Sequence, residues 1–256
     1  MLRPRIIPCL LIHEGGLVKT VGFKDPKYVG DPVNAVKIFN EKESDELIVL
    51  DIDATANGIE PDYKIIAEMA AECRMPLCYG GGVRTAQQAK TIIGLGGEKV
   101  AISAAAVERP ELITEIAQAV GRQSVVVVID AKKRMMSKNH DVCTHNGRQN
   151  SKRDVLDFAA QAAELGAGEI VLNSIDLDGK MTGYDLDLAR RLRECVSTPI
   201  SIVGGAGSLE HMRDLFTACG VVGAVAGSLF VFKGSFRAVL INYPDTCQKE
   251  ALFTNL

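Results

Sequence analysis

Two stretches of this 256-residue sequence repeat one pattern and decide its fold: Gly80–Ala106, GGGVRTAQQAKTIIGLGGEKVAISAAA, and Gly204–Phe230, GGAGSLEHMRDLFTACGVVGAVAGSLF. Each begins with a run of glycines, continues as an amphipathic segment and ends in a short apolar run. The upstream segments ELIVLDID, from Glu46, and EIVLNSID, from Glu169, also match at nearly the same spacing. A repeat of this length predicts two similar halves.

The whole chain alternates short β-branched runs with longer helical patterns. The expected strands are Ile6–Leu11, Leu47–Ile52, Leu77–Tyr79, Val100–Ser103, Val125–Ile129, Ile170–Asn173, Ile200–Val203 and Ala224–Ala226, and the expected helices are Pro32–Glu43, Tyr63–Arg74, Ala86–Leu95, Pro110–Val120, Val155–Leu165, Leu186–Cys195 and Leu209–Ala218. Strands that are apolar almost throughout indicate a parallel sheet covered by helices. We therefore expect an α/β fold, a (β/α)8 TIM barrel built from two repeated (βα)4 halves, forming a single domain over residues 1–256. An open doubly wound sheet would give no reason for the repeat.

Composition excludes several classes of protein. The net charge of −3 gives no general attraction to nucleic acid or to an anionic membrane. The sequence has no apolar run long enough to span a membrane, and its N-terminus becomes polar too quickly for a secretory signal. The seven cysteines form no C-x-x-C motif. We expect a cytoplasmic protein with no membrane span and no nucleic-acid partner.

The glycine turns are the first chemical signal. Glycines let backbone N–H groups approach an anion closely, and the helix that follows favours negative charge at its N-terminus. A lone Gly-Gly turn is more often just a tight turn, but two copies related by the repeat favour a pair of phosphate cradles. The predicted phosphate-binding residues are Gly81, Gly82, Ser103 and Ala104 in the first half and Gly204, Gly205, Gly227 and Ser228 in the second, with Gly179.

Aspartates at or just beyond the strand ends are the second signal. They are Asp51, Asp53, Asp130, Asp176 and Asp178. In a barrel this face carries the chemistry, and an aspartate there is a candidate general acid or base. Helix capping or loop bracing explains Asp176 and Asp178 equally well. Asp130 ends an entirely apolar strand, which favours a functional role.

Several segments resemble the HisF family, the cyclase subunit of imidazole glycerol phosphate synthase: RIIPCL, LDID, YGGGV, AAAVERPELITEIA, SVVVVIDAK, GAGEIVLNSIDLDG, GYD and GGAG. The resemblance runs over nearly the whole chain. It implies a (β/α)8 barrel that docks its N-terminal face on a HisH-like glutaminase. Ammonia from the glutaminase would cross the barrel to a phosphorylated ligand, a bisphosphate in the family. Two aspartates at the ends of the first and fifth strands act there as an acid–base pair.

The family pattern assigns the fifth-strand acid to Asp130, but the position of the first-strand acid holds Leu11. Leucine cannot carry a proton, so the paired mechanism is not available in its usual form. Asp51 and His13 are candidate substitutes, although neither occupies the symmetric position. Further departures are Ser103 for asparagine, Asn173 for threonine and Val203 for serine. Together with Leu11 they indicate an altered acceptor site.

Four charged residues stand just before strands at the other end of the predicted barrel: Arg5, Glu46, Lys99 and Glu169. Solvated charges at strand starts are the simpler interpretation. In the HisF family, however, the matching positions form a charged ring at the ammonia entrance, and all four residue types agree. Glu98 matches an acid at the glutaminase interface. The resemblance thus implies an ammonia gate that is retained.

Two loops are predicted to shape the ligand surface. In His13–Asp31, Lys19 matches a lysine of the family's substrate-covering loop; a mobile lid with solvated lysines explains it as well. We count Lys19, Asp51 and Asp178 as the candidate substrate-loop residues. The basic segment Lys132–Arg153 is expected to form an exposed hairpin, and contact with an anionic sugar donor or a downstream enzyme is the alternative. His140, His145 and His211 have no metal-ligand spacing and are expected at the surface, and no metal site or cofactor is indicated.

A narrower resemblance links the chain to HisF paralogues of surface-polysaccharide loci, the WbuZ type. It rests on segments such as PKYVGDPVNAVKIFNEKESDELIVLDIDAT, AECRMPLCYGGGV and RAVLINYP. In those relatives the position of Leu11 is also apolar. The resemblance implies ammonia delivery to a separate sugar amidotransferase in lipopolysaccharide (O-antigen) biosynthesis. Two alternatives stay open: an authentic cyclase of histidine biosynthesis, and a non-catalytic scaffold that activates the glutaminase.

Overall fold

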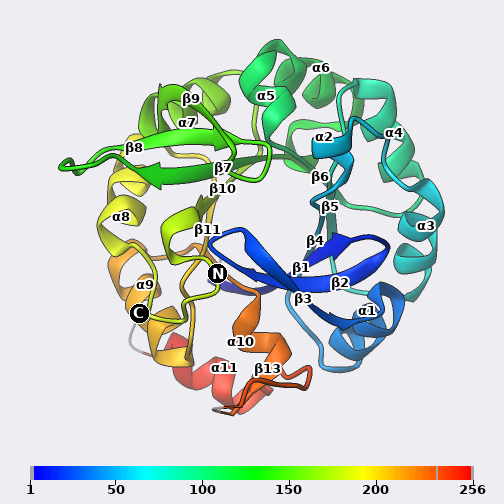
Figure 1. The fold of residues 1–256 in the computed structure, drawn as a ribbon, viewed down its shortest axis with the longest axis vertical. Helices are drawn as coiled ribbons and strands as arrows, with labels where there is room; N and C mark the ends of the chain where they lie inside the picture. The colour runs from blue at the N-terminus through cyan, green and yellow to red at the C-terminus, as the bar shows by residue number, and fades with distance from the viewer. Residues whose placement is uncertain (1–2, 235, 255–256) are drawn as a thin grey trace.

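The computed structural model describes residues 3–234 and 236–254, which form a closed barrel of eight parallel strands inside a ring of helices (Figure 1). The barrel strands are β1 (Arg5–His13), β4 (Leu47–Asp51), β5 (Leu77–Gly80), β6 (Lys99–Ile102), β7 (Val125–Lys133), β10 (Glu169–Ser174), β11 (Ile200–Val203) and β12 (Gly223–Ala226). They follow one another in chain order, and the pairing of β12 with β1 closes the barrel. The predicted (β/α)8 barrel is therefore confirmed.

Amphipathic helices cover the outside of the barrel. They are α1 (Pro32–Glu41), α3 (Tyr63–Glu72), α4 (Ala86–Gly94), α6 (Glu111–Val120), α7 (Val155–Glu164), α8 (Leu186–Cys195) and α9 (Leu209–Cys219). Side chains cap their first turns: Thr85 begins α4 and Ser208 begins α9 at matching places of the repeat, each accepting a backbone N–H. None of the helices in residues 3–234 and 236–254 is long and apolar enough to cross a membrane.

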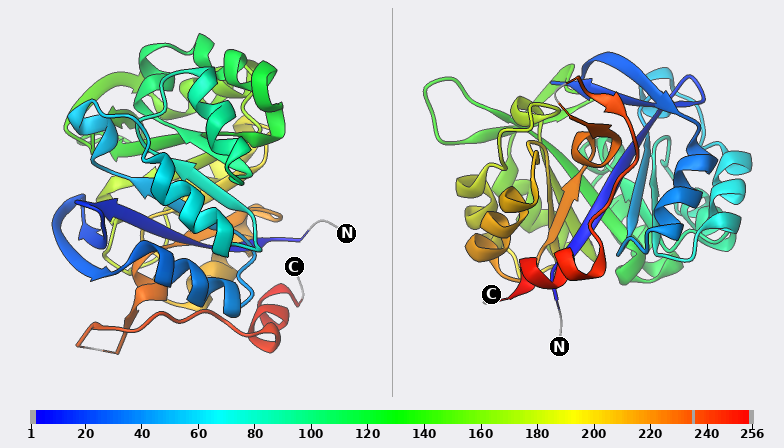
Figure 2. Two further views of the ribbon diagram at one scale, coloured as in Figure 1. Left: turned by 90° about the vertical axis from the view of Figure 1, so that its right-hand side faces the viewer. Right: turned by 90° about the horizontal axis from the view of Figure 1, so that it is seen from below.

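Two hairpins extend the strands that the repeat relates to each other. β2 (Gly16–Val21) and β3 (Lys24–Gly30) continue β1, whereas β8 (His140–Thr144) and β9 (Gln149–Asp154) continue β7. The segment His13–Asp31 was predicted as a loop and instead pairs as antiparallel strands. The predicted hairpin over Lys132–Arg153 is confirmed. Figure 2 places both hairpins at the end of the barrel opposite the N-terminus.

Short elements complete the ends of the barrel strands. α2 (Ala54–Asn57), α5 (Ala104–Glu108) and α10 (Ser228–Val231) follow β4, β6 and β12, and the 3₁₀ turns η1 (Arg122–Ser124) and η2 (Ile175–Leu177) flank β7 and β10. The chain then forms the small hairpin β13 (Phe232–Lys233) and β14 (Ala238–Val239) and ends in α11 (Thr246–Phe253). Between β14 and α11 an extended segment runs down the barrel to its N-terminal end (Figure 2).

The buried apolar side chains form two separate groups. One lies between the strands and the helices and includes Phe39, Phe158 and Phe216. The other fills the barrel interior: Ile7, Cys9, Ile48, Cys78, Ala101, Val126, Val128, Val171 and Val225. Alternation along each strand sends neighbouring residues to the two groups. The interior column is uncharged and separates the two ends of the barrel.

Candidate functional site

Two adjoining pockets open at the carboxyl ends of the barrel strands, which we call the mouth. The first spans about 920 Å³ of space and the second about 670 Å³, with the solvent at their openings included. Leu11, Phe23, Leu50, Val128 and Asn173 line both. The two pockets therefore meet over the apolar column at the centre of the barrel.

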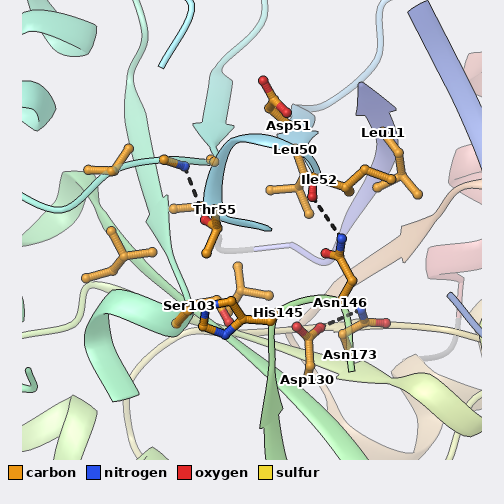
Figure 3. Close-up of a pocket in the computed structure, with 18 of the residues that line it drawn as sticks. Leu11, Leu50, Asp51, Ile52, Thr55, Ser103, Asp130, His145, Asn146 and Asn173 are labelled. Atoms are coloured by element: carbon orange, nitrogen blue, oxygen red, sulfur yellow. Dashed lines mark hydrogen bonds between the residues drawn. The ribbon is translucent and has the colours of Figure 1, made fainter. Parts of the chain in front are cut away.

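The strand register fixes the correspondence between Leu11 and Asp130. Leu11 of β1 pairs with Leu50 of β4, and Asp130 of β7 pairs with Asn173 of β10. Leu50 and Asn173 are themselves related by the repeat that aligns Glu46 with Glu169. Leu11 thus occupies in the first half the place that Asp130 occupies in the second (Figure 3). It is partly buried against the interior column.

Asp130 is held at the mouth by the side chain of a neighbouring strand. Asn173 Nδ2 donates to Asp130 Oδ1 at 2.8 Å. Burial raises the pKa of Asp130 to about 6, although the bond from Asn173 acts to lower it. The Oδ1 atom of Asn173 is buried and has no hydrogen-bond partner among the described residues. A carboxyl group that titrates near neutrality and a free amide acceptor therefore lie side by side.

The other candidate aspartates are engaged in holding the local backbone. Asp51 accepts the N–H groups of Asp53 and Ala54, and burial raises its pKa. Asp53 binds the ring of His13 at 2.8 Å. Of these, only Asp51 lines a pocket at the mouth, so His13 is not placed to substitute for the missing acid.

Two more aspartates brace the loops of the mouth. Asp176 accepts the N–H of Lys133 at 2.8 Å. Asp178 accepts from Thr20 Oγ1 at 2.8 Å and from the N–H of Phe23 at 3.2 Å, and it also lines the second pocket. Asp178 thus joins the β2–β3 hairpin to the loop after β10. The bracing interpretation holds for both residues.

The predicted phosphate-binding residues divide between the pockets. Gly81, Gly82, Ser103 and Ala104 line the first, and Gly179, Gly204, Gly205, Gly227 and Ser228 line the second; we call these sets the first and second cradles. At Gly81 an added Cβ would lie 2.5 Å from the backbone oxygen of Asp51, and at Gly205 it would lie 2.0 Å from that of Gly183. These turns accept only glycine because the neighbouring backbone is too close. Of the family departures, Ser103 lies in the first cradle and Val203 in the wall of the second pocket.

Lys19 lies inside the second pocket rather than on a solvated lid. It is 6% exposed, and its Nζ donates to the backbone oxygen of Cys9. An added Cβ at Gly227 would lie 2.7 Å from this ammonium group. Burial lowers the pKa of Lys19. Of the two interpretations left open for Lys19, the solvated lysine does not hold, because the β2–β3 hairpin folds it over the mouth.

The prediction of surface histidines was wrong for His140. His140 is 5% exposed and its Nε2 lies 3.3 Å from Asp185 Oδ2. His145, at the tip of the β8–β9 hairpin, lines the first pocket. Its neighbour Asn146 donates from Nδ2 to the backbone oxygen of Ile52 at 2.8 Å and ties the hairpin to the strand-end loop after β4. Sequence spacing carries no signal for these contacts, because hairpin tip and loop are distant in sequence.

At the N-terminal end of the barrel, Arg5, Glu46, Lys99 and Glu169 meet in one closed network, which we call the charged ring. Arg5 contacts Glu46 and lies 2.7 Å from Glu169, while Lys99 Nζ lies 2.7 Å from both glutamates. Ser201 Oγ donates to Glu169 at 2.5 Å. These side chains come from five different strand starts, so the simpler interpretation of separate solvated charges does not hold.

Charge pairing within the ring offsets the cost of burying it. Burial acts to lower the pKa of Arg5 and Lys99, yet the two glutamates raise both above their ordinary values. Burial acts to raise the pKa of Glu169, but the two cations hold it at about 2. The pKa of Glu46 stays above its ordinary value because burial and the charge of Glu169 both raise it. Glu98, beside Lys99, is exposed on the same face.

The described residues contain no cluster of three or more His, Cys, Asp or Glu side chains that could hold a metal ion. The polar side chains that line the two pockets include Asp51, Asp130, Asn173 and Asp178, together with Lys19 and His145. A closed barrel with its polar site at the strand carboxyl ends defines the class: a (β/α)8-barrel protein.

Comparison with known proteins narrows the class to a family. Residues 5–237 match the histidine biosynthesis protein family. A protein of Leptospira borgpetersenii, provisionally named an imidazole glycerol phosphate synthase subunit HisF, is 53% identical over 99% of this chain and 100% of its own length. A Vibrio vulnificus protein, provisionally named subunit hisF3, is 56% identical over 98% and 96%. The HisF subunit of Streptomyces coelicolor is 42% identical over 90% and 91%. The chain belongs to the HisF family.

Proposed function

We propose that this barrel works with a HisH-like glutaminase as an ammonia-transfer subunit and has lost the two-acid cyclase reaction of its family. The observation that carries the proposal is the contrast between a complete charged ring and a mouth in which Leu11 stands opposite Asp130. The names of the relatives place HisF in imidazole glycerol phosphate synthase, and the partner is inferred from the HisF resemblance.

The charged ring supports an entrance role. It lies at the amino ends of the strands, directly below an interior column of apolar side chains and two thiols, Cys9 and Cys78. Such a column disfavours ions because it offers them no compensating charge, whereas neutral ammonia is much less penalised. Opening the ring requires Lys99 to leave Glu46 and Glu169. The bound glutaminase would supply that opening, with Glu98 at the contact.

The mouth supports a receiving role. Asp130 and the unpaired Oδ1 of Asn173 offer two acceptors to the N–H groups of an arriving ammonia molecule. Because burial raises the pKa of Asp130 to about 6, its carboxylate can take a proton from the nucleophile near neutral pH. Leu11 and Leu50 face this pair with no group that could protonate a leaving oxygen.

The two cradles support a phosphorylated small molecule as ligand. We assign the downstream acceptor to sugar amidation in surface-polysaccharide biosynthesis, performed with a separate sugar amidotransferase. This assignment rests on the resemblance to polysaccharide-locus paralogues. A cytoplasmic location follows from the same role.

A second candidate function, the authentic cyclase, is favoured by the position of Asp51. Its carboxyl group lines the same pocket as Asp130, and burial raises its pKa. Two acids are therefore present at the first pocket even without one at position 11. A non-catalytic glutaminase activator is the third possibility, and it needs only the charged ring and its face.

The direct test measures imidazole glycerol phosphate formation from the ribulosyl substrate with excess ammonium salt. We expect no turnover by the wild-type chain and a measurable gain in Leu11→Asp, with Leu11→Asn as the isosteric control that carries no proton. Robust wild-type turnover would refute the proposal. If Asp51→Asn and Asp130→Asn each abolished that turnover, the cyclase with a relocated acid would be correct.

A second assay separates transfer from scaffolding. Glutamate release by the purified glutaminase is measured alone, with this chain, and with the Glu98→Lys variant. We expect the chain to stimulate release and the reversed charge to weaken the stimulation. Stimulation with no dependence on any phosphorylated ligand would favour the scaffold.

A further inference from the structure

A third cavity opens beside the first pocket and shares part of its wall. It spans about 870 Å³ of space, with the solvent at its opening included, and lies between α2, the turn after Gly82, α5 and the tip of the β8–β9 hairpin. Thr55, Val83, Ala104, Ala105 and His145 line both this side cavity and the first pocket. The two spaces are therefore continuous along the first cradle.

Two basic side chains reach the side cavity. Arg84 lies with its Nη2 3.8 Å from the Cβ position of Gly58, at the C-terminal end of α2. Its guanidinium group has no ion pair and no side-chain hydrogen bond to any residue in 3–234 or 236–254. His145 stands at the border with the first pocket, 24% exposed, with Nδ1 3.1 Å from Thr144 Oγ1. Its Nε2 lies 4.0 Å from Oε1 of Glu108, which lines the side cavity.

Thr55 connects the side cavity to the cradle. Its Oγ1 accepts the N–H of Gly82 at 3.3 Å, so the hydroxyl proton is free for a ligand in either space. Figure 3 shows Thr55, Ser103 and His145 on the same side of the first pocket, away from Leu11. An anion in the cradle would thus have a hydroxyl and two basic groups on its outer side.

The side cavity has no equivalent at the second cradle. Six residues run from Gly80 to the helix cap Thr85, but five run from Gly204 to the cap Ser208, and none of those five is an arginine. The second cradle instead faces the buried ammonium group of Lys19. One acid lines the side cavity, Glu108, whose Oε1 lies 4.0 Å from His145 Nε2 and whose side chain is 64% exposed.

We propose that the side cavity is a subsite for the second phosphate of a diphosphate ester whose first phosphate sits in the first cradle. Arg84 binds the outer phosphate, Thr55 contacts the bridge, and His145 closes the border between the two spaces. This deepens the proposed function and rests on its ligand site. It changes the expected ligand from one with phosphates at opposite ends to one with two linked phosphates at one end.

Calorimetric titration of the purified chain with inorganic phosphate and with pyrophosphate, in buffer without divalent cations, tests the subsite. One added charge-assisted contact corresponds to about a tenfold gain in affinity, so pyrophosphate should bind about tenfold more tightly than phosphate. Arg84→Ala should remove that gain and leave phosphate affinity within about twofold. Glu108→Gln should strengthen pyrophosphate binding, because it removes the negative charge at the cavity.

Arg74→Ala is the matched control. Arg74 is an exposed arginine just before β5, at the opposite end of the barrel, so its loss should change neither affinity. If phosphate binds but pyrophosphate gains nothing, or if Arg84→Ala weakens both ligands equally, the subsite is refuted and the cradle stands. If neither ligand binds, the subsite and the ligand part of the proposed function both fall.

Discussion

At the amino ends of the barrel strands both halves of the repeat contribute charges to one ring, whereas at the carboxyl ends the halves differ. There the first half presents Leu11 and Leu50, and the second presents Asp130 hydrogen bonded to Asn173. The same strands β1 and β7 supply both ends, since Arg5 begins β1 and Asp130 lies near the end of β7. A barrel strand can therefore keep its chemistry at one end while the other end changes.

The difference follows from how each site is held. A buried ring of four charges fails when one member is lost, because the remaining charges are left unpaired in a poorly solvated place. A leucine at the mouth, in contrast, packs on the interior column and leaves Asp130 with its partner Asn173. Substitution is thus tolerated at the mouth far better than in the ring.

The largest effect on stability is expected for Glu169→Leu, which removes one member of the charged ring. It leaves Arg5 and Lys99 with Glu46 alone, and we expect the free energy of unfolding to fall by about 3–5 kcal/mol. Urea denaturation at pH 7 measures it. Glu98→Gln, an exposed neighbour of the ring, should change stability by less than about 0.5 kcal/mol. A loss below about 1 kcal/mol for Glu169→Leu would mean that the ring behaves as ordinary surface charges.

Asp130→Asn tests whether the carboxyl group at the mouth is buried. Burial raises the pKa of Asp130 to about 6 in the folded protein, above its unfolded value of about 3.9. The folded state then holds the proton more tightly, so the wild type loses stability relative to the variant as pH rises from about 4 through 6, and the difference levels off above. A shift of about two pKa units corresponds to a change of about 2–3 kcal/mol in the difference in unfolding free energy between the two chains.

Urea denaturation of both chains between pH 4 and pH 8 checks this. Asparagine still accepts the bond from Asn173, so only the titration changes. Asp214→Asn, on the exposed side of α9, serves as the control and should run parallel to the wild type. Parallel curves for Asp130→Asn as well would show that its carboxyl group is solvated.

The smallest expected effect concerns the hairpin that covers the mouth. Asn146 has a φ of 56° and donates to Ile52. Asn146→Ala loses the bond and puts alanine, which tolerates the left-handed region less well than asparagine, at this φ, which should cost about 1–2 kcal/mol. Asn146→Gly loses the bond but adopts this φ without strain, so it should cost less. Thermal denaturation separates the two, and equal losses would mean that backbone strain contributes nothing.

The sequence alone predicted the architecture and much of the candidate site. Repeated periodic segments fixed the barrel, because strand and helix patterns are local properties of the chain. The correspondence of Leu11 with Asp130 followed from the same repeat, and the register bears it out. Each of the four ring residues precedes a strand, and strand starts meet at one end of a barrel. Their meeting in one ring, however, was implied by the HisF resemblance, because strand-start charges taken by themselves favour the solvated interpretation.

Only the tertiary structure decided which loop residues reach the mouth. Lys19 is buried and His145 lines the first pocket because two hairpins fold back over the strand ends, and that path is set by contacts such as Asn146 with Ile52. These contacts join residues far apart in sequence, so no periodic pattern records them. Arg84 is likewise a candidate phosphate-binding residue only because the fold brings α2, α5 and the hairpin tip around one cavity.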